Sequence, residues 1–152
     1  MADIVGASTR SKMMACVKGK DTIQEVEIRK RLFALGFRYR LHVKKLSGTP
    51  DIVLPKYKAV IFIHGCFWHV HDCHLFRWPK SKKAFWKKKL SGNKKRDIKN
   101  IESLKKLGWR ILVIWECSFR GTGKNHDHEI ARVVRQVSKW LTSRQNYSEI
   151  AE

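Results

Sequence analysis

The stretch VIFIHGCFWHVHDC, residues 60–73, combines a strongly apolar run with most of the metal-ligating side chains of this sequence. It opens with a run of branched and aromatic apolar residues, which is typical of a strand covered on both faces. Gly65 then allows the backbone to turn sharply. Cysteines, histidines and aromatic residues follow the turn, so the stretch predicts a buried strand that runs into a functional loop.

The loop predicts a structural zinc site, because thiolate and imidazole are ligands that suit zinc. One short segment offers three of them: Cys66, His71 and Cys73. The expected fourth ligand is Cys117, which follows the second strongly apolar run, 109–115, since parallel neighbouring strands end at the same edge of a sheet. The alternative is a set of buried thiols beside a histidine-rich loop. Within a zinc site, either of two nearby histidines could replace His71: His69 or His74.

Length and charge limit the class of protein. With 152 residues, 43% of them hydrophobic, the chain fits one domain with a real core. No apolar run approaches the roughly 20 residues of a membrane span, so we expect no membrane association. The formal charge of +20, from 33 Lys+Arg against 13 Asp+Glu, indicates a polyanionic partner, and nucleic acid is the first candidate. A merely basic cytosolic protein or a membrane-surface binder is the alternative.

Taken in order, the chain predicts an α/β sandwich around a mixed sheet. Residues 1–20 are expected to form a basic N-terminal arm, residues 21–142 the domain and residues 143–152 a solvated tail. The first expected helix runs from Asp21 or Thr22 to Gly36, with a core stripe of Ile28, Leu32 and Leu35, and strands are expected over 37–44, 52–54, 59–64 and 109–115. Between the last two strands we expect a helix from Ser81 that breaks at Gly92 and a second helix that ends at Gly108. The last expected helix buries five apolar residues: Ile130, Val133, Val134, Val137 and Leu141.

Two acidic residues have both a structural and a functional interpretation. Glu25 completes the pattern Thr22-x-x-Glu25, which is a capping box, so its carboxylate could serve only the start of a helix. Asp51 opens the strand at Ile52, where it could bind a hard divalent cation or simply cap the preceding Gly-Pro turn.

The segment 75–89 interleaves aromatic residues with lysines, which is the composition of a surface that stacks on bases and contacts phosphates. A small helix that packs some of these aromatic residues inward is the alternative. The aromatic residues are Phe76, Trp78, Phe85 and Trp86.

Four segments together resemble the very short patch repair (Vsr) DNA mismatch endonucleases. They are GTPDIV at 48–53, VIFIHGCFWH at 60–69, Asn93-x-x-Arg96-Asp97, and GWRILVIWEC at 108–117. The resemblance covers roughly residues 9–141. It implies a restriction-endonuclease-like three-layer sandwich, with a mixed central sheet flanked by helices, and a magnesium-dependent nick beside the mispaired thymine of a T:G mismatch.

The resemblance also implies roles for individual residues. The magnesium aspartate falls on Asp51, the catalytic histidine on His69 with His64 close by, and a helix carboxylate on Glu25. The zinc ligands fall on Cys66, His71, Cys73 and Cys117. The aromatic residues that wedge into the base stack fall on Phe67, Trp68 and Trp86, although one of two adjacent aromatics could instead face the core.

The chain departs from the wider nuclease superfamily in one respect. Where the strand after Asp51 usually ends in an acid-x-Lys pair, this chain has Ile63 and His64, so a metal ligand from Ile63 must be its backbone carbonyl. We assign proton transfer to His69, because imidazole titrates near neutral pH.

The expected enzyme starts very short patch repair as a monomer in a bacterial cytoplasm, associated with the nucleoid, with repair proteins as candidate partners. Two other functions stay open: a different sequence-specific restriction-type endonuclease, and a non-catalytic zinc module that only binds DNA.

Overall fold

A computed structural model of the chain describes residues 22–120 and 124–152. The predicted basic arm, residues 1–20, lies outside these ranges. The α-helices of the described ranges are α2 (Ile23–Ala34), α3 (Lys83–Lys106) and α4 (Lys124–Leu141), with short 3-10 helices η1 (Pro55–Tyr57) and η2 (Glu116–Ser118). The strands are β1 (Arg40–Leu41), β2 (Ile52–Leu54), β3 (Ala59–His64), β4 (Arg110–Trp115) and β5 (Tyr147–Ile150).

The strands form one mixed sheet in the order β1-β2-β3-β4-β5. β1, β2 and β3 pair antiparallel, whereas β3, β4 and β5 pair parallel. The parallel pairing of β3 with β4 sets His64 opposite Trp115. The segments that follow these two strands therefore leave the sheet at the same edge, as the sequence predicts.

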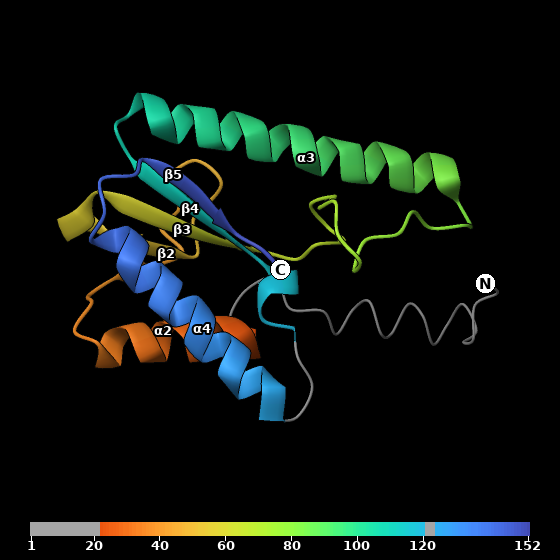
Figure 1. Ribbon diagram of the computed structural model, residues 1–152. Helices are drawn as coiled ribbons and strands as arrows, with labels where there is room; N and C mark the ends of the chain where they lie inside the picture. The colour runs from red at the N-terminus through yellow and green to blue at the C-terminus, as the bar shows by residue number, and fades with distance from the viewer. Residues whose placement is uncertain (1–21, 121–123) are drawn as a thin grey trace.

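Helices cover both faces of the sheet, so the chain folds as a three-layer sandwich. Figure 1 shows α3 on one face and α2 and α4 on the other. Alternate residues of the strands point into two cores: Ile52, Ile61 and Leu112 pack with α2 and α4, whereas Val53, Val60 and Ile111 pack with Leu104 of α3. The mixed-sheet sandwich is confirmed, and the predicted core residues of the last helix are buried: Ile130, Val133, Val134, Val137 and Leu141.

The first helix, α2, begins as its capping pattern predicts. The Thr22 side chain accepts a hydrogen bond of 3.2 Å from the backbone N–H of Glu25. The helix gives way to Gly36, whose φ of +97° suits glycine. Leu35 was expected in the core stripe but is 58% exposed, because it follows the last helical residue and no longer lies on the buried face.

Gly92 does not break the second helical region, and this expectation is wrong. α3 runs without interruption from Lys83 to Lys106. Glycine in a helix interior costs only about 1 kcal/mol relative to alanine. Leu90 and Leu104, one on each side of Gly92 and both fully buried, hold the helix against the rest of the protein and outweigh that cost.

The strand predicted over 37–44 is reduced to the two residues of β1. Phe37 is buried, as its alternation with polar residues predicts, but Leu41 is 37% exposed. His42 has a φ of 47°, which lies outside the β region and ends the strand.

The solvated tail predicted over 143–152 is also wrong, because this segment adds strand β5 to the sheet. β5 pairs parallel with β4, and Ile150 is buried. The Arg110 guanidinium secures the connection by donating to four carbonyls, of Trp140, Leu141, Ser143 and Gln145. The sequence YSEI does not alternate apolar with polar residues, so periodicity could not reveal the strand.

None of the helices in the described ranges combines the length and apolar character needed to cross a membrane.

Candidate metal centre and active-site cavity

The loop after β3 folds back on itself through its backbone. The N–H of His69 donates to the carbonyl of Gly65 at 3.2 Å, and the N–H of His71 donates to the carbonyl of Cys66 at 3.0 Å. Glu116, just after β4, accepts the N–H of Cys66 at 3.2 Å. These bonds tie the loop to the edge where β3 and β4 end.

The structure brings all four predicted zinc ligands together. One ligand atom from each of Cys66, His71, Cys73 and Cys117 lies within 4.8 Å of the others. The Nδ1 atom of His71 is 3.5 Å from the Sγ atoms of both Cys66 and Cys117. Zinc bonds of ordinary length in a tetrahedron would place sulfur about 3.6 Å from nitrogen. Donor types and spacing therefore fit a tetrahedral metal site.

Burial of the cluster favours the neutral forms of its side chains as long as no cation is bound. Burial raises the pKa of the Cys66 and Cys117 thiols, so thiolates there require a nearby positive charge. Burial lowers the pKa of His71, which keeps its imidazole in the neutral form that ligates metals. The other two histidines considered for this site are engaged elsewhere: His69 with Asp97 and His74 with Glu152.

Three of the four predicted catalytic residues meet in a second place, a cavity of about 610 Å³. Asp51, Ile63, His64 and His69 line it. Its other lining residues come from the segment after β1, from the turn before β2, from β3 and from α3: His42, Lys44, Gly48, Thr49, Phe62, Asp97 and Asn100. Glu25, although buried, is not among the residues that line this cavity.

Asp51 is held with one oxygen toward the protein. Its Oδ2 atom accepts the backbone N–H of Ile63 at 2.7 Å. Burial raises the pKa of this carboxyl group, and the hydrogen bond from Ile63 partly offsets the rise. A partly buried carboxylate beside an open cavity is the hard oxygen donor that magnesium prefers, so the residues present fit that ion.

The two histidines of the cavity have different chemistry. His69 Nδ1 lies 2.5 Å from Asp97 Oδ2, which fixes the orientation of the imidazole ring. The His64 ring stacks on it, with centroids 3.8 Å apart and planes 5° apart. Burial, followed by the nearby His69, lowers the pKa of His64 to about 3, so this ring is neutral and weakly basic at pH 7.

Asp97 is a residue of the candidate site that the sequence did not predict. It appeared in a quoted motif, but no role was assigned to it. The available signal was its context: it is the only acidic residue between Asp72 and Glu102 in a lysine-rich segment. The lysines of this helix suit contact with a polyanion, whereas a lone carboxylate among them would repel phosphate. Asp97 is therefore better suited to contact another side chain than to contact DNA.

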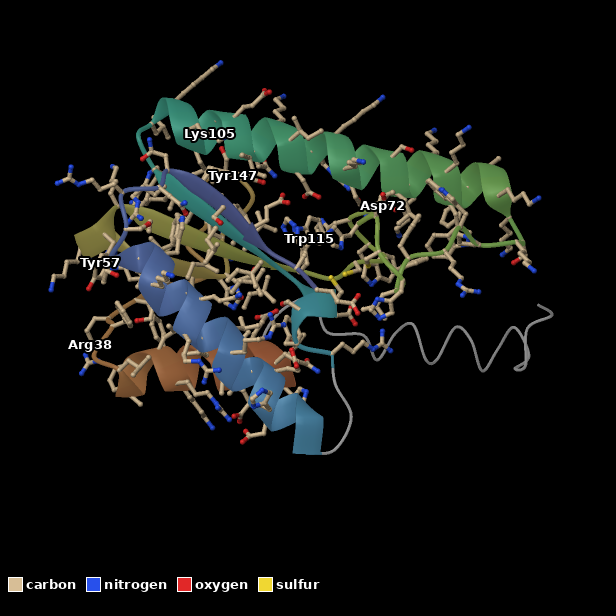
Figure 2. All side chains as sticks on the ribbon, in the orientation of Figure 1. Arg38, Tyr57, Asp72, Lys105, Trp115 and Tyr147 are labelled. Atoms are coloured by element: carbon tan, nitrogen blue, oxygen red, sulfur yellow. The ribbon has the colours of Figure 1, made fainter. Side chains whose placement is uncertain are left out.

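The three predicted wedge residues form one cluster beside the metal centre. The Phe67 ring lies 5.1 Å from the Trp68 ring and 5.5 Å from the Trp86 ring, between centroids. Adjacent aromatics can share a cluster here because the loop is a turn, where the alternation of a strand does not apply. Figure 2 shows this loop and its side chains below the start of α3, next to the sulfur atoms. Trp78 and Phe85 are about half exposed nearby, at 50% and 54%.

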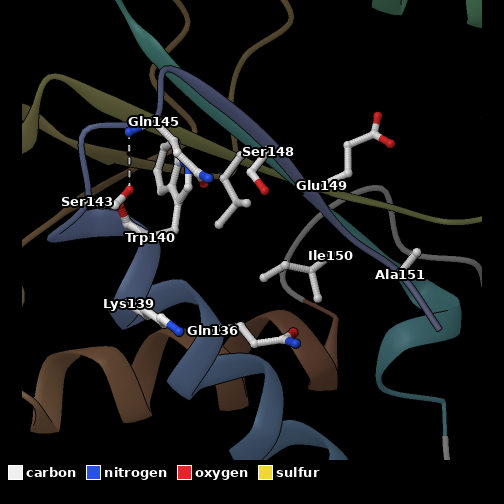
Figure 3. Close-up of a pocket in the computed structure, with 10 residues that line it drawn as sticks. Gln136, Lys139, Trp140, Ser143, Gln145, Ser148, Glu149, Ile150 and Ala151 are labelled. Atoms are coloured by element: carbon white, nitrogen blue, oxygen red, sulfur yellow. Dashed lines mark hydrogen bonds between the residues drawn. The ribbon is translucent and has the colours of Figure 1, made fainter.

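A second cavity, of about 410 Å³, lies between α4 and β5 (Figure 3). Its lining residues include Trp140, Ser148 and Ile150, and no histidine or cysteine. It lacks the grouped acid and imidazole of the first cavity, which is therefore the better candidate for chemistry.

The cavity groups a carboxylate with an imidazole held by a second carboxylate, beside a long lysine-rich helix, and this arrangement suits the class of phosphodiester-cleaving enzymes. Comparison with known proteins agrees with this class. The sequence model of the family described as DNA mismatch endonuclease Vsr matches residues 2–75. The chain is 45% identical over 137 residues to a type II nicking enzyme, V.NmeAIP, of Neisseria meningitidis, across 90% of this chain and 97% of the relative.

Two further relatives support the assignment. The chain is 39% identical to DNA mismatch endonuclease Vsr of Escherichia coli, across 93% of this chain and 88% of the relative. It is 41% identical to the type II nicking enzyme V.XorIIP of Xanthomonas oryzae, across 81% of this chain and 90% of the relative. The chain therefore belongs to the Vsr family of DNA mismatch endonucleases, and it is a DNA-cleaving endonuclease.

Proposed function

We propose that this endonuclease nicks one strand of duplex DNA beside the mispaired thymine of a T:G mismatch, in a magnesium-dependent reaction that initiates very short patch repair. The observation that carries the proposal is the meeting of Asp51 with the His69–Asp97 pair in one cavity. The cavity thus unites a group that can hold a cation with a group that can move a proton. Family membership supplies the substrate class.

His69 acts as the proton-transfer group. Asp97 engages Nδ1, which leaves Nε2 of the same ring to accept a proton from the attacking water. His64 is a poor base because of its lowered pKa, and its stacked ring serves to position His69. These roles make Asp97 and His64 positioning residues and His69 the catalytic base.

Asp51 and the backbone carbonyl of Ile63 would hold the magnesium ion. The bound ion would supply charge neutralisation at the scissile phosphate and a more acidic water. Asp51 presents its second oxygen to the cavity, since the first accepts the N–H of Ile63. Glu25 does not line the cavity, so its assignment rests on the resemblance, and its own burial in the first turn of α2 favours an indirect role.

The zinc site is structural. Four protein ligands would complete the tetrahedron and leave no open position for substrate. The site joins the loop bearing Phe67, Trp68 and His69 to Cys117 after β4. Zinc binding would thereby fix the loop that carries both the base and the wedge.

Phe67, Trp68 and Trp86 wedge into the base stack. Inserting apolar side chains costs a few kcal/mol of unstacking, and a mispair lowers that cost because it is already weakly stacked. The lysines of α3 beside the cluster would hold the phosphate backbone. We assign this activity to a restriction-endonuclease-like fold. We propose that the enzyme is a monomer in the cytoplasm, associated with the nucleoid, and that repair proteins act on its nicked product.

A panel of substrates tests the proposal. The purified zinc-loaded chain with magnesium should nick a duplex containing a T:G mismatch, and should leave the matched duplex and single-stranded DNA of the same sequence largely intact. Equal nicking of the matched duplex would instead favour a restriction-type nicking enzyme. DNA binding without nicking of any substrate would favour a non-catalytic DNA-binding module.

A further inference from the structure

His42 contacts the proposed magnesium residue from the neighbouring strand. β1 pairs Arg40 with Val53 and Leu41 with Ile52, so the next position sets His42 opposite Asp51. The backbone N–H of His42 donates to the Asp51 carbonyl at 3.4 Å. The side chain of His42 is only 18% exposed and lines the active-site cavity.

Two residues near Asp51 have a strained, left-handed backbone conformation. His42 has a φ of 47° and Thr49 a φ of 48°, and both residues line the cavity. A left-handed conformation at a residue other than glycine costs roughly 1–2 kcal/mol. Strain of this kind concentrates at functional sites, where the surrounding structure enforces it. At His42 it ends the strand and brings the imidazole toward the carboxylate.

The distance between the two side chains suits a shared cation. His42 Nδ1 lies 3.8 Å from Asp51 Oδ1, which is too long for a hydrogen bond. Two ligands at about 2.1 Å from one octahedral ion would be about 3 Å apart in adjacent positions and about 4.2 Å apart in opposite positions. The observed 3.8 Å matches neither value but lies between them, so a small shift of either side chain would let both groups bind one ion. The other carboxylate oxygen, Oδ2, is already engaged by Ile63.

We propose that His42 supplies an imidazole nitrogen to the divalent cation at Asp51. This inference rests on the proposed function, which places such a cation there. Imidazole is a poor ligand for magnesium and a better one for manganese, because manganese accepts nitrogen donors more readily. The site therefore binds manganese more tightly than a site made only of carboxylate and carbonyl oxygens would. The competing interpretation is a simple ion pair between a protonated His42 and Asp51.

The test uses the full zinc-loaded chain with Mn²⁺ alone, without DNA, and pulsed electron paramagnetic resonance to detect a histidine nitrogen bound to the ion. His42→Asn is the main variant, because asparagine tolerates the left-handed backbone but carries no imidazole. His42→Gln is the second variant, and His74→Asn, at the exposed pair with Glu152, is the matched control. Competition with Mg²⁺ gives the affinity for magnesium, and thermal melting monitors folding.

We expect nitrogen coupling in the wild-type chain and its loss in His42→Asn. We also expect Mn²⁺ affinity to fall about tenfold or more in that variant, with a smaller fall for Mg²⁺. The control should match the wild type. Absence of nitrogen coupling in the wild type would overturn the proposal, as would coupling that survives both His42 substitutions or the Asp51→Asn substitution.

A nicking assay separates this inference from the proposed function. If the wild type nicks T:G duplexes but His42 makes no difference to Mn²⁺ binding, the inference fails and the proposed function stands. If His42 binds Mn²⁺ but the wild type nicks no T:G duplex, the proposed function fails although the metal ligand is real.

Discussion

Replacing Asp97 with asparagine should slow DNA nicking while leaving DNA binding unchanged. Asp97 Oδ2 lies 2.5 Å from His69 Nδ1 and orients the imidazole ring through this nitrogen. General-base catalysis contributes about 10²–10⁴-fold to rate. Because Asp97 positions the base and does not itself take the proton, we expect a loss in the lower part of this range, about 10²–10³-fold. That loss corresponds to roughly 3–4 kcal/mol of transition-state stabilisation.

The assay is single-turnover nicking of a T:G duplex at saturating enzyme, so that binding does not enter the rate. Glu102→Gln, an exposed carboxylate one to two turns further along the same helix, is the matched control and should behave as the wild type. If Asp97 acts through His69, the double variant Asp97→Asn with His69→Gln should be no slower than His69→Gln alone. If Asp97→Asn slowed nicking by no more than about threefold, the loss would be far smaller than a general base contributes. That result would refute the proposed pairing of Asp97 with His69. Fully multiplicative losses in the double variant would show that the two residues act independently.

Cys117→Ser should lower both the zinc content and the melting temperature, because metal binding contributes to folding; one zinc per chain with an unchanged melting temperature would remove Cys117 from the ligand set. Trp68→Ala should reduce nicking of T:G duplexes and leave matched-duplex binding and the fold intact, so wild-type nicking by this variant would argue against its role as a wedge. Affinity for DNA should fall on the order of a thousandfold or more between about 50 and 200 mM salt if the lysines of α3 and the N-terminal arm contact about 6–10 phosphates, and a flat salt profile would contradict that footprint. Arg110→Ala should reduce the free energy of unfolding by about 2–4 kcal/mol in denaturant titrations, because it leaves four carbonyls without their charged donor, whereas the exposed Arg144→Ala should have little effect.

The sequence predicted the parts of the fold that depend on apolar periodicity. β3 and β4 are buried along nearly their whole length, and α4 carries a regular apolar stripe, so local pattern and tertiary burial agree. β5 and the continuity of α3 could not be predicted in this way. β5 is held by pairing with β4 and by Arg110, and α3 passes Gly92 because of packing on either side, which are both tertiary effects.

The candidate site likewise contains residues that the local sequence predicts and residues that only tertiary structure brings in. The loop residues Cys66, His71 and Cys73 are close in sequence, and Cys117 follows a parallel neighbour of the same strand, so their meeting could be foreseen. Asp97 and His42 reach the cavity from α3 and from the end of β1, and their positions depend on helix packing and on a left-handed backbone. The isolation of Asp97 among lysines marks it in the sequence, but neither its approach to His69 nor the left-handed backbone of His42 could be read from a local pattern.

The proposed active site can be tested with one substitution, Asp51→Ala, by comparing DNA nicking with DNA binding. Asp51 belongs to the reaction, whereas phosphate contacts dominate affinity, so the two properties should separate. On one T:G duplex in magnesium, the variant should bind with a dissociation constant close to that of the wild type and should produce no detectable nick. Near-normal nicking by Asp51→Ala under these conditions would contradict the proposed active site.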